Sequence, residues 1–432
     1  MIVSPKFLLT TGGQLTLFYA FVISMINHKI SELKGIRKLL TESSVISLSV
    51  LPLLILDFHI FQPFSILLTI GFGFLFDVIL LPLLLGTFLL SLIGYNFNIN
   101  HIFQILEWLI HEVDLPLHYP LVLGNPRPIE LLILFFLIGL LIDNLFKKRR
   151  QIIFAGLIVC SFFICKNPVY PSITAVDIGQ GDSIFLQDKF NKKIILIDTG
   201  GRLALPQESW QKPQSQTNAE KTLIPYLESV GVSQIDQLIL THTDADHVGD
   251  FLNLADKIKI KEIWVSPGEL TNNHFVEKLK KANIAIHISK VGDKIPIFDS
   301  ALQVLSNGYT GKGDNNDSIV TYGNFYHTKF LFTGDLEQEG EKELLKNYPK
   351  LKVDVLKVGH HGSKTSSNPD FIKEINPKLA LISVGEKNRY GHPNQETLET
   401  LKKNQIRILR TDQKGALKLM QINQQWRIQT VR

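Results

Sequence analysis

Four side chains able to bind metal ions stand close together in one segment of this 432-residue chain. His242, Asp244, Asp246 and His247 fall within six consecutive positions, directly after the apolar run 235–240. A run of that length followed by polar residues predicts a strand that ends in a loop. Imidazole nitrogens and carboxylate oxygens are common ligands of divalent ions. The segment therefore predicts a metal centre at the end of a buried strand.

Further candidate ligands follow later apolar runs in the same way. Loops that follow neighbouring strands meet at one edge of a sheet, so these clusters are expected to lie together. Two divalent cations a few ångströms apart need a shared anionic ligand, and Asp335 suits that bridging position. His360 or His361 completes the set, and the residues alone do not distinguish the two. The later clusters are Asp335 after the run 329–332, His360 and His361 after 353–358, and His392 after 379–384.

Asp246 and His392 are the candidate catalytic groups. His392, or whichever of His360 and His361 is not a ligand, could contact a phosphate or protonate a leaving oxygen. The Gly-His-Pro segment around His392 can equally be an ordinary turn. The candidate substrate contacts are Asn315, Asn316, Ser318 and Lys364, with Ser318 in a loop that caps the site.

Three aspartates earlier in the chain have supporting roles in this interpretation. Asp198 is expected to accept a hydrogen bond that orders His247, and Asp177 and Asp182 lie in strand and turn positions around the site. Direct metal ligation by these three is the less favoured alternative. The strands and the helices between them, such as 222–230 and 395–404, predict a layered α/β domain.

The composition divides the chain before residue 172. Residues 1–166 are rich in Leu, Ile and Phe, whereas 172–432 mix apolar and charged residues, and the formal net charge of the whole chain is +5. That balance neither requires nor excludes a nucleic-acid partner. Cys160 and Cys165 both stand in the last apolar run and form no zinc or disulfide pattern.

Serial apolar runs in residues 1–166 predict a polytopic membrane region of about six spans. The long run 64–95 is expected to break near 77–82 into two spans, and a short run could instead be a core or interfacial helix. Basic residues at 29–38 and 147–150 mark two cytoplasmic loops. Four spans between those loops would place residues 172–432 outside the cytoplasm. The segment 100–112 is predicted to be an amphipathic helix, on the membrane face or against the spans.

Several motifs together resemble the ComEC-type competence proteins, and the likeness extends loosely to Ser4-Pro5, Phe7, Gln14 and Leu15 in the membrane part. The resemblance implies a metallo-β-lactamase (αββα sandwich) domain after a competence membrane domain, and Asp at the position of Asp244 is usual in that family. The motifs are Asp-Ile-Gly-Gln-Gly-Asp-Ser-Ile at 177–184, Thr-His-Thr-Asp-Ala-Asp-His at 241–247, Phe-Thr-Gly-Asp at 332–335, Lys-Val-Gly-His-His-Gly-Ser at 357–363 and Gly-His-Pro at 391–393.

The resemblance also implies a function in natural transformation at the cell membrane. One DNA strand would enter, and the extracytoplasmic domain would degrade the other by metal-dependent phosphodiester hydrolysis. Single-stranded DNA, the membrane, a DNA receptor and a translocation ATPase are the implied partners. Family members are longer at the N-terminus, so the sequence is interpreted as a truncated or reduced member.

The expected cofactors are two divalent ions that activate a water for attack on phosphorus. The oxygen-rich ligand set, with Asp244 in place of a histidine and Asp314 or a neighbouring Asn in place of another, favours Mn, with Zn second. Two alternatives stay open: a membrane-anchored hydrolase of another phosphodiester or ester, and a non-functional channel fragment. Lys364, Lys387 and Arg389 near the metal loops would favour DNA over small esters.

Overall fold

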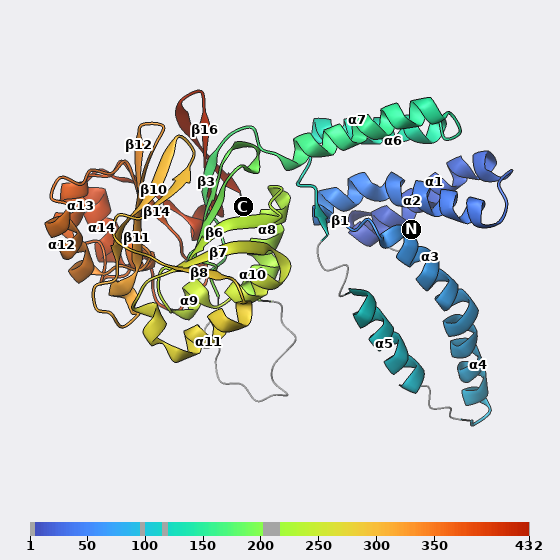
Figure 1. Ribbon diagram of the computed structural model, residues 1–432, viewed down its shortest axis with the longest axis horizontal. Helices are drawn as coiled ribbons and strands as arrows, with labels where there is room; N and C mark the ends of the chain where they lie inside the picture. Colours follow the sequence, from blue (N-terminus) through green and yellow to red (C-terminus); the bar gives the residue numbers. More distant parts are fainter. Residues whose placement is uncertain (1–4, 96–99, 115–119, 202–216, 432) are drawn as a thin grey trace. The chain divides into compact units, whose positions relative to one another are not determined.

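The structure is a computed structural model that describes residues 5–95, 100–114, 120–201 and 217–431. The chain divides into two compact units, Met1–Lys166 and Asn167–Arg432. Figure 1 shows both, and each is described by itself.

The first unit is helical, and within its described residues one small sheet pairs two short antiparallel strands. Two of its described helical stretches, Gly35–Phe58 and Ser65–Leu92, are long and apolar enough to cross a membrane. None of the most apolar window of Ser65–Leu92 is buried within the protein, as expected of a helix that faces lipid. The elements are α1 (Thr11–Ile30), α2 (Gly35–Phe58), β1 (Ile60–Phe61), α3 (Ser65–Leu75), α4 (Leu81–Leu92), α5 (Asn100–Asp114), β2 (Leu121–Val122), α6 (Pro128–Asp143) and α7 (Lys148–Lys166).

The predicted break of the run 64–95 into two spans is wrong. Helices α3 and α4 are joined by a π-helical turn, Phe76–Leu80, and the helical path continues past Pro82. A π turn inserts an extra residue and widens the helix, so the proline ring is accommodated without a reversal of the chain. The stretch Ser65–Leu92 therefore counts as one candidate span, and the number of spans between the basic loops stays a prediction. The side of the membrane on which the second unit lies stays a prediction.

The second unit contains two mixed sheets. The eight-stranded sheet has the order β17-β16-β3-β4-β5-β6-β7-β8, and the seven-stranded sheet has the order β15-β14-β13-β12-β11-β10-β9. The neighbouring strands from β5 to β8, and from β12 to β15, are parallel. The strands are β3 (Ser172–Ala175), β4 (Ile184–Gln187), β5 (Ile194–Ile197), β6 (Gln234–Ile239), β7 (Lys259–Val265), β8 (Ala285–Ile288), β9 (Lys294–Ile297), β10 (Ser300–Asn307), β11 (Ile319–Phe325), β12 (Thr328–Phe332), β13 (Val355–Lys357), β14 (Leu379–Ile382), β15 (Arg407–Arg410), β16 (Ala416–Ile422) and β17 (Gln425–Val431).

Side chains from both sheets form one apolar core between them, including Leu186, Ile195, Phe330 and Leu381. Each sheet buries its other face under helices, because most of its strands are apolar on both faces. Figure 1 shows the two helical layers on the outer sides of the sheets. This order confirms the predicted αββα sandwich. The covering helices are α8 (Ile224–Ser229), α10 (Phe251–Lys257) and α11 (Asn273–Ala282) on one side, and α12 (Gln338–Asn347), α13 (Pro369–Ile375) and α14 (Gln395–Lys403) on the other.

Candidate metal centre

The candidate ligands lie in loops that follow the carboxyl ends of parallel strands. His242 comes three residues after β6, and Asp246 and His247 belong to the single turn α9 (Ala245–Val248). Asp335 follows β12, and His361 lies in a short 3-10 turn after β13. The strand order thus brings segments more than 100 residues apart in the sequence to one site.

Asp335 lies among the histidines. Its Oδ1 is 3.1 Å from Nε2 of His247, and its Oδ2 is 3.5 Å from Nε2 of His361. Nε2 of His361 is also 3.2 Å from Oδ2 of Asp246. Potential ligand atoms lie within 4.8 Å of one another in each of four overlapping sets: His242 with His247 and Asp335; Asp246 with His247 and His361; Asp182 with Asp335 and His361; and Asp182 with Asp198 and His247.

The outward nitrogens of the three buried histidines are held by the protein. Nδ1 of His247 donates to Oδ2 of Asp198 at 2.8 Å, and Nδ1 of His361 donates to the carbonyl of Ser383 at 2.9 Å. The Thr241 hydroxyl donates to Asp198 at 2.7 Å, so it accepts from Nδ1 of His242 at 3.0 Å. The predicted role of Asp198 toward His247 matches this contact.

The inward nitrogens fit a metal centre. Nε2 of His242, His247 and His361, and Oδ1 of Asp335, are buried without a hydrogen-bond partner among the described residues. Buried polar atoms are nearly always satisfied, so a converging group of unsatisfied atoms calls for a ligand. Bonds at Nδ1 leave the Nε2 lone pairs free to bind a cation. The donor set of three imidazoles and several carboxylates suits divalent transition ions.

The carboxylates determine how these imidazoles hold a proton when no cation is bound. Burial alone would lower the pKa of His247, but Asp335 and Asp198 outweigh it and raise that pKa well above its usual value. The pKa of His242 lies well below its usual value because of burial and the nearby His247. The raised pKa favours the protonated form of His247 when no cation is bound, so a metal ion would compete with a proton at this residue.

Lys357 is a buried member of the site that the sequence analysis gave no role. Its side chain is 1% exposed and forms an ion pair with Asp182. Its Nζ also donates to the carbonyl of Gly334 at 2.7 Å and lies 3.7 Å from Oδ1 of Asp335. Burial would lower the pKa of Lys357, but these carboxylates outweigh it and raise that pKa. A single lysine inside the apolar run 353–358 was the signal that could have identified it.

Two predicted ligands lie at the rim of this cluster. Asp244 has a half-exposed side chain with Oδ2 3.8 Å from Nε2 of His242. Nε2 of His360 is 3.9 Å from Oδ2 of Asp335, and Nδ1 of His360 is 3.1 Å from the Thr365 hydroxyl. Of the two adjacent histidines, His361 is therefore the one inside the buried set.

Two predicted substrate contacts instead support the turn that carries Asp335. The buried Ser318 hydroxyl accepts from the backbone N–H of Asp335 at 3.0 Å. The buried Asn316 side chain accepts from the backbone N–H groups of Glu337 and Gly340, at 3.2 and 3.3 Å. The side-chain oxygens of Ser318 and Asn316 accept from backbone N–H groups around the start of α12 that have no acceptor within the helix. These two side chains are therefore not positioned to face a substrate.

Three other predicted residues remain accessible. Asn315 is half-buried, with Nδ2 3.4 Å from Nδ1 of His360. Lys364 is exposed. The half-buried His392 ring has its centroid 5.6 Å from that of His360.

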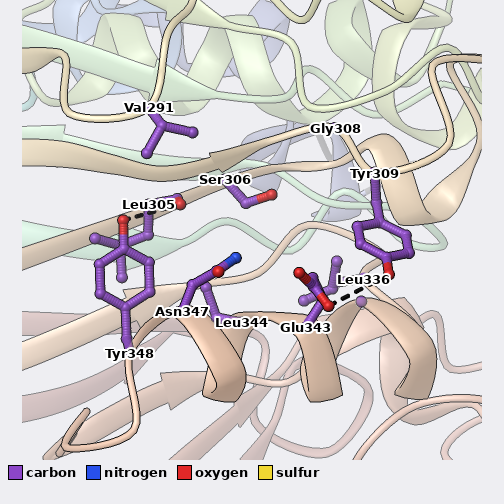
Figure 2. Close-up of a pocket in the computed structure, with 11 residues that line it drawn as sticks. Val291, Leu305, Ser306, Gly308, Tyr309, Leu336, Glu343, Leu344, Asn347 and Tyr348 are labelled. Atoms are coloured by element: carbon purple, nitrogen blue, oxygen red, sulfur yellow. Dashed lines mark hydrogen bonds between the residues drawn. The ribbon is translucent and has the colours of Figure 1, made fainter.

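A cavity of about 430 Å³ lies elsewhere in this unit, between β10 and α12. Figure 2 shows Tyr309 and Tyr348 at its two ends. The Tyr309 hydroxyl donates to Oε2 of Glu343 at 3.3 Å. None of the candidate metal ligands lines this cavity, so it is distinct from the metal centre.

Comparisons with known proteins match both units. Residues 176–386 match the Metallo-beta-lactamase superfamily, and residues 1–148 match the Competence protein family. The chain is 33% identical to ComE operon protein 3 of Bacillus subtilis (strain 168), over 96% of this chain and 56% of that protein.

Two further relatives match a smaller part of the chain. Competence protein ComA of Neisseria gonorrhoeae is 29% identical over 57% of this chain and 32% of its own length. Recombination protein 2 of Haemophilus influenzae is 27% identical over 60% of this chain and 30% of its own length. The chain thus spans about half or less of the length of these three relatives.

Proposed function

Since the chain belongs to the family of ComEC-type competence proteins, we propose that it acts in DNA uptake as a membrane protein with a phosphodiesterase domain. Proteins of this family are membrane proteins, and the metallo-β-lactamase superfamily suggests a metal-dependent hydrolase. The observation that carries the proposal is the convergence of unpartnered Nε2 atoms of His242, His247 and His361 around Asp335.

The ligands of the proposed centre form two groups that share Asp335. His242 with the rim residue Asp244 would hold one divalent ion, and Asp246, His247 and His361 would hold the other. Bound ions would supply Lewis-acid polarisation of the phosphate and a water of lowered pKa. Mn is the proposed metal and Zn the second candidate, since both accept imidazole and carboxylate ligands.

Protein groups around the cluster hold these ligands in place. Asp198 fixes the ring of His247, and Lys357 balances the charge of Asp182 and Asp335. Burial and the neighbouring His360 and His361 lower the pKa of His392. A neutral His392 suits a hydrogen bond to a phosphate oxygen better than proton donation to the leaving oxygen.

The proposed substrate is single-stranded DNA, namely the strand that is not taken up. The exposed Lys364, Lys387 and Arg389 carry positive charge on loops near the candidate ligands, and such cations attract a phosphate backbone. The proposal includes a multi-pass membrane location, an extracytoplasmic second unit, and a DNA receptor and translocation ATPase as partners. Helices Gly35–Phe58 and Ser65–Leu92 are the proposed membrane-spanning segments that the structure best supports.

A nuclease assay on the full chain in detergent tests this function. We expect Mn-dependent cleavage of a labelled single-stranded oligonucleotide, with loss in Asp246→Ala and His247→Ala. The exposed His274→Ala is the matched control and should cleave as the wild type does. Metal content measured by mass spectrometry on the same samples shows whether the variants lost the ions. Bound metal without cleavage of any oligonucleotide would contradict the proposal and favour another ester substrate.

A further inference from the structure

We propose that Tyr390 is a stacking platform for a nucleobase of the substrate strand, beside the metal centre. This inference rests on the proposed function and deepens it, because it names the part of the substrate that the site recognises besides phosphate. A base-stacking residue would separate DNA from other phosphodiesters, which offer the same phosphate to the same metal ligands.

A series of aromatic rings leads from the buried cluster to Tyr390. The ring of His361 has its centroid 6.3 Å from that of His360, and the ring of His360 lies 5.6 Å from that of His392. The Tyr390 ring is 5.9 Å from that of His392, and the two planes differ by only 14°. Tyr390 is therefore the outermost ring of a path that begins at a candidate metal ligand.

The exposure of Tyr390 makes its ring available to a ligand. Its side chain is 53% exposed, whereas His361 at the inner end of the path is 1% exposed. With a parallel neighbour on one side only and this exposure, the Tyr390 ring offers accessible surface to a ligand. Every nucleobase has a flat π face, so an exposed aromatic ring beside a backbone-binding site binds single strands with little sequence preference.

The loop that presents Tyr390 is ordered by its own hydrogen bonds. The Asn388 side chain donates to the carbonyls of Gly385 and His392, at 3.0 and 2.8 Å, and accepts from the backbone N–H of His392 at 2.9 Å. The backbone N–H of Gly385 donates to the Gln180 side chain at 3.4 Å. A ring held in place before the ligand arrives loses little conformational entropy on binding.

The charge around Tyr390 favours a nucleic-acid strand over a neutral aromatic ligand. Lys387 and Arg389 belong to the same loop and are exposed, and with the exposed Glu386 the loop carries a net charge of +1. Cations next to an exposed aromatic ring can contact phosphates on either side of a stacked base. The cavity between β10 and α12 also has an exposed tyrosine, Tyr309, but Glu343 lies beside it and would repel a phosphate.

Binding measurements on the full chain in detergent test the proposal. Fluorescence anisotropy compares a labelled oligothymidylate with an abasic oligomer of the same length, both with EDTA so that no cleavage occurs. We expect Tyr390→Leu to weaken binding of the oligothymidylate roughly tenfold, in the range seen when a stacking ring is removed. The wild type and Tyr390→Leu should bind the abasic oligomer equally. Tyr390→Phe, which keeps an aromatic ring, should bind the oligothymidylate as the wild type does.

Tyr309→Leu is the matched control, since Tyr309 is 52% exposed, nearly as much as Tyr390. Equal binding of both oligomers by the wild type, or no binding of either, would overturn the base-stacking role. Equal loss in Tyr309→Leu and Tyr390→Leu would overturn it as well. Base-dependent binding through Tyr390, without cleavage when Mn is added, would support the platform while the proposed nuclease function fails.

Discussion

Replacement of Lys357 by Met tests whether a buried ammonium group holds the carboxylates of the metal centre together. Met keeps much of the length of the side chain and removes its charge. The side chains of Lys357 and Asp182 are only 1% and 2% exposed, and Nζ also lies 3.7 Å from Oδ1 of Asp335. Removal of one partner of a buried ion pair costs about 3–5 kcal/mol, because the other charge is left without compensation. We expect the second unit to lose about that much free energy of unfolding when no metal is bound.

Hydrogen exchange of the β13 amides, with EDTA and the full chain in detergent, measures this loss as a free energy of opening. The double variant Lys357→Met/Asp182→Asn should recover most of the stability, since it removes the uncompensated carboxylate. Lys378→Met is the control: its Nζ lies 2.8 Å from Oδ1 of Asp354, but its side chain is 84% exposed, so we expect no measurable change. Equal losses in the two single variants would refute the reasoning, and so would a double variant no more stable than Lys357→Met.

Three further predictions concern groups around the site. Thr241→Val removes the nearer hydroxyl partner of Nδ1 of His242, at 3.0 Å against 3.5 Å for Ser318, and should weaken Mn binding by roughly 10- to 100-fold; an unchanged dissociation constant from calorimetry would contradict the role. Burial raises the pKa of Glu341 from 4.5 to about 8. Because the folded pKa is the higher one, its stabilising contribution is complete below pH 4.5 and is lost as the pH rises through about 8. Thermal unfolding across this range should show less of that fall in Glu341→Gln, and parallel profiles would exclude the effect. Asp317→Asn should speed amide exchange at 309–311 and 313, whose N–H groups donate to that carboxylate; unchanged exchange rates would show that other contacts hold the loop.

The sandwich and most of its ligand loops were predictable because each ligand follows an apolar strand in the sequence. Which of His360 and His361 is the buried ligand could not be predicted from the sequence. Both adopt left-handed backbone, with φ of 47° and 52°, and only the tertiary packing of their turn directs one ring inward. Asn316 and Ser318 were predicted to contact substrate, with Ser318 in a loop that caps the site. Their hydrogen bonds with backbone N–H groups, which depend on the fold, bury them.

Strands β9 and β17 are hard to predict from the sequence. Strand β17 lies at a sheet edge and is exposed at most positions, and its alternating apolar pattern is short, with Trp426 and Ile428 packed against the core. Strand β9 is four residues long, contains Pro296 and lies at the edge of the other sheet, where proline is tolerated. In the first unit, Pro82 suggested the end of a helix. The π turn before it lets the helix continue past the proline.

The position of β3 constrains the order in which the second unit can be assembled during synthesis. This strand is the first of the unit to leave the ribosome, yet in the finished sheet it lies between β4 and β16. Its partner β16 is among the last strands to be made. One edge of β3 therefore stays open through most of translation, and an open strand edge can pair with other chains. A nascent chain that stops before Ala416 would keep that edge permanently, so premature termination favours aggregation over a partly active domain.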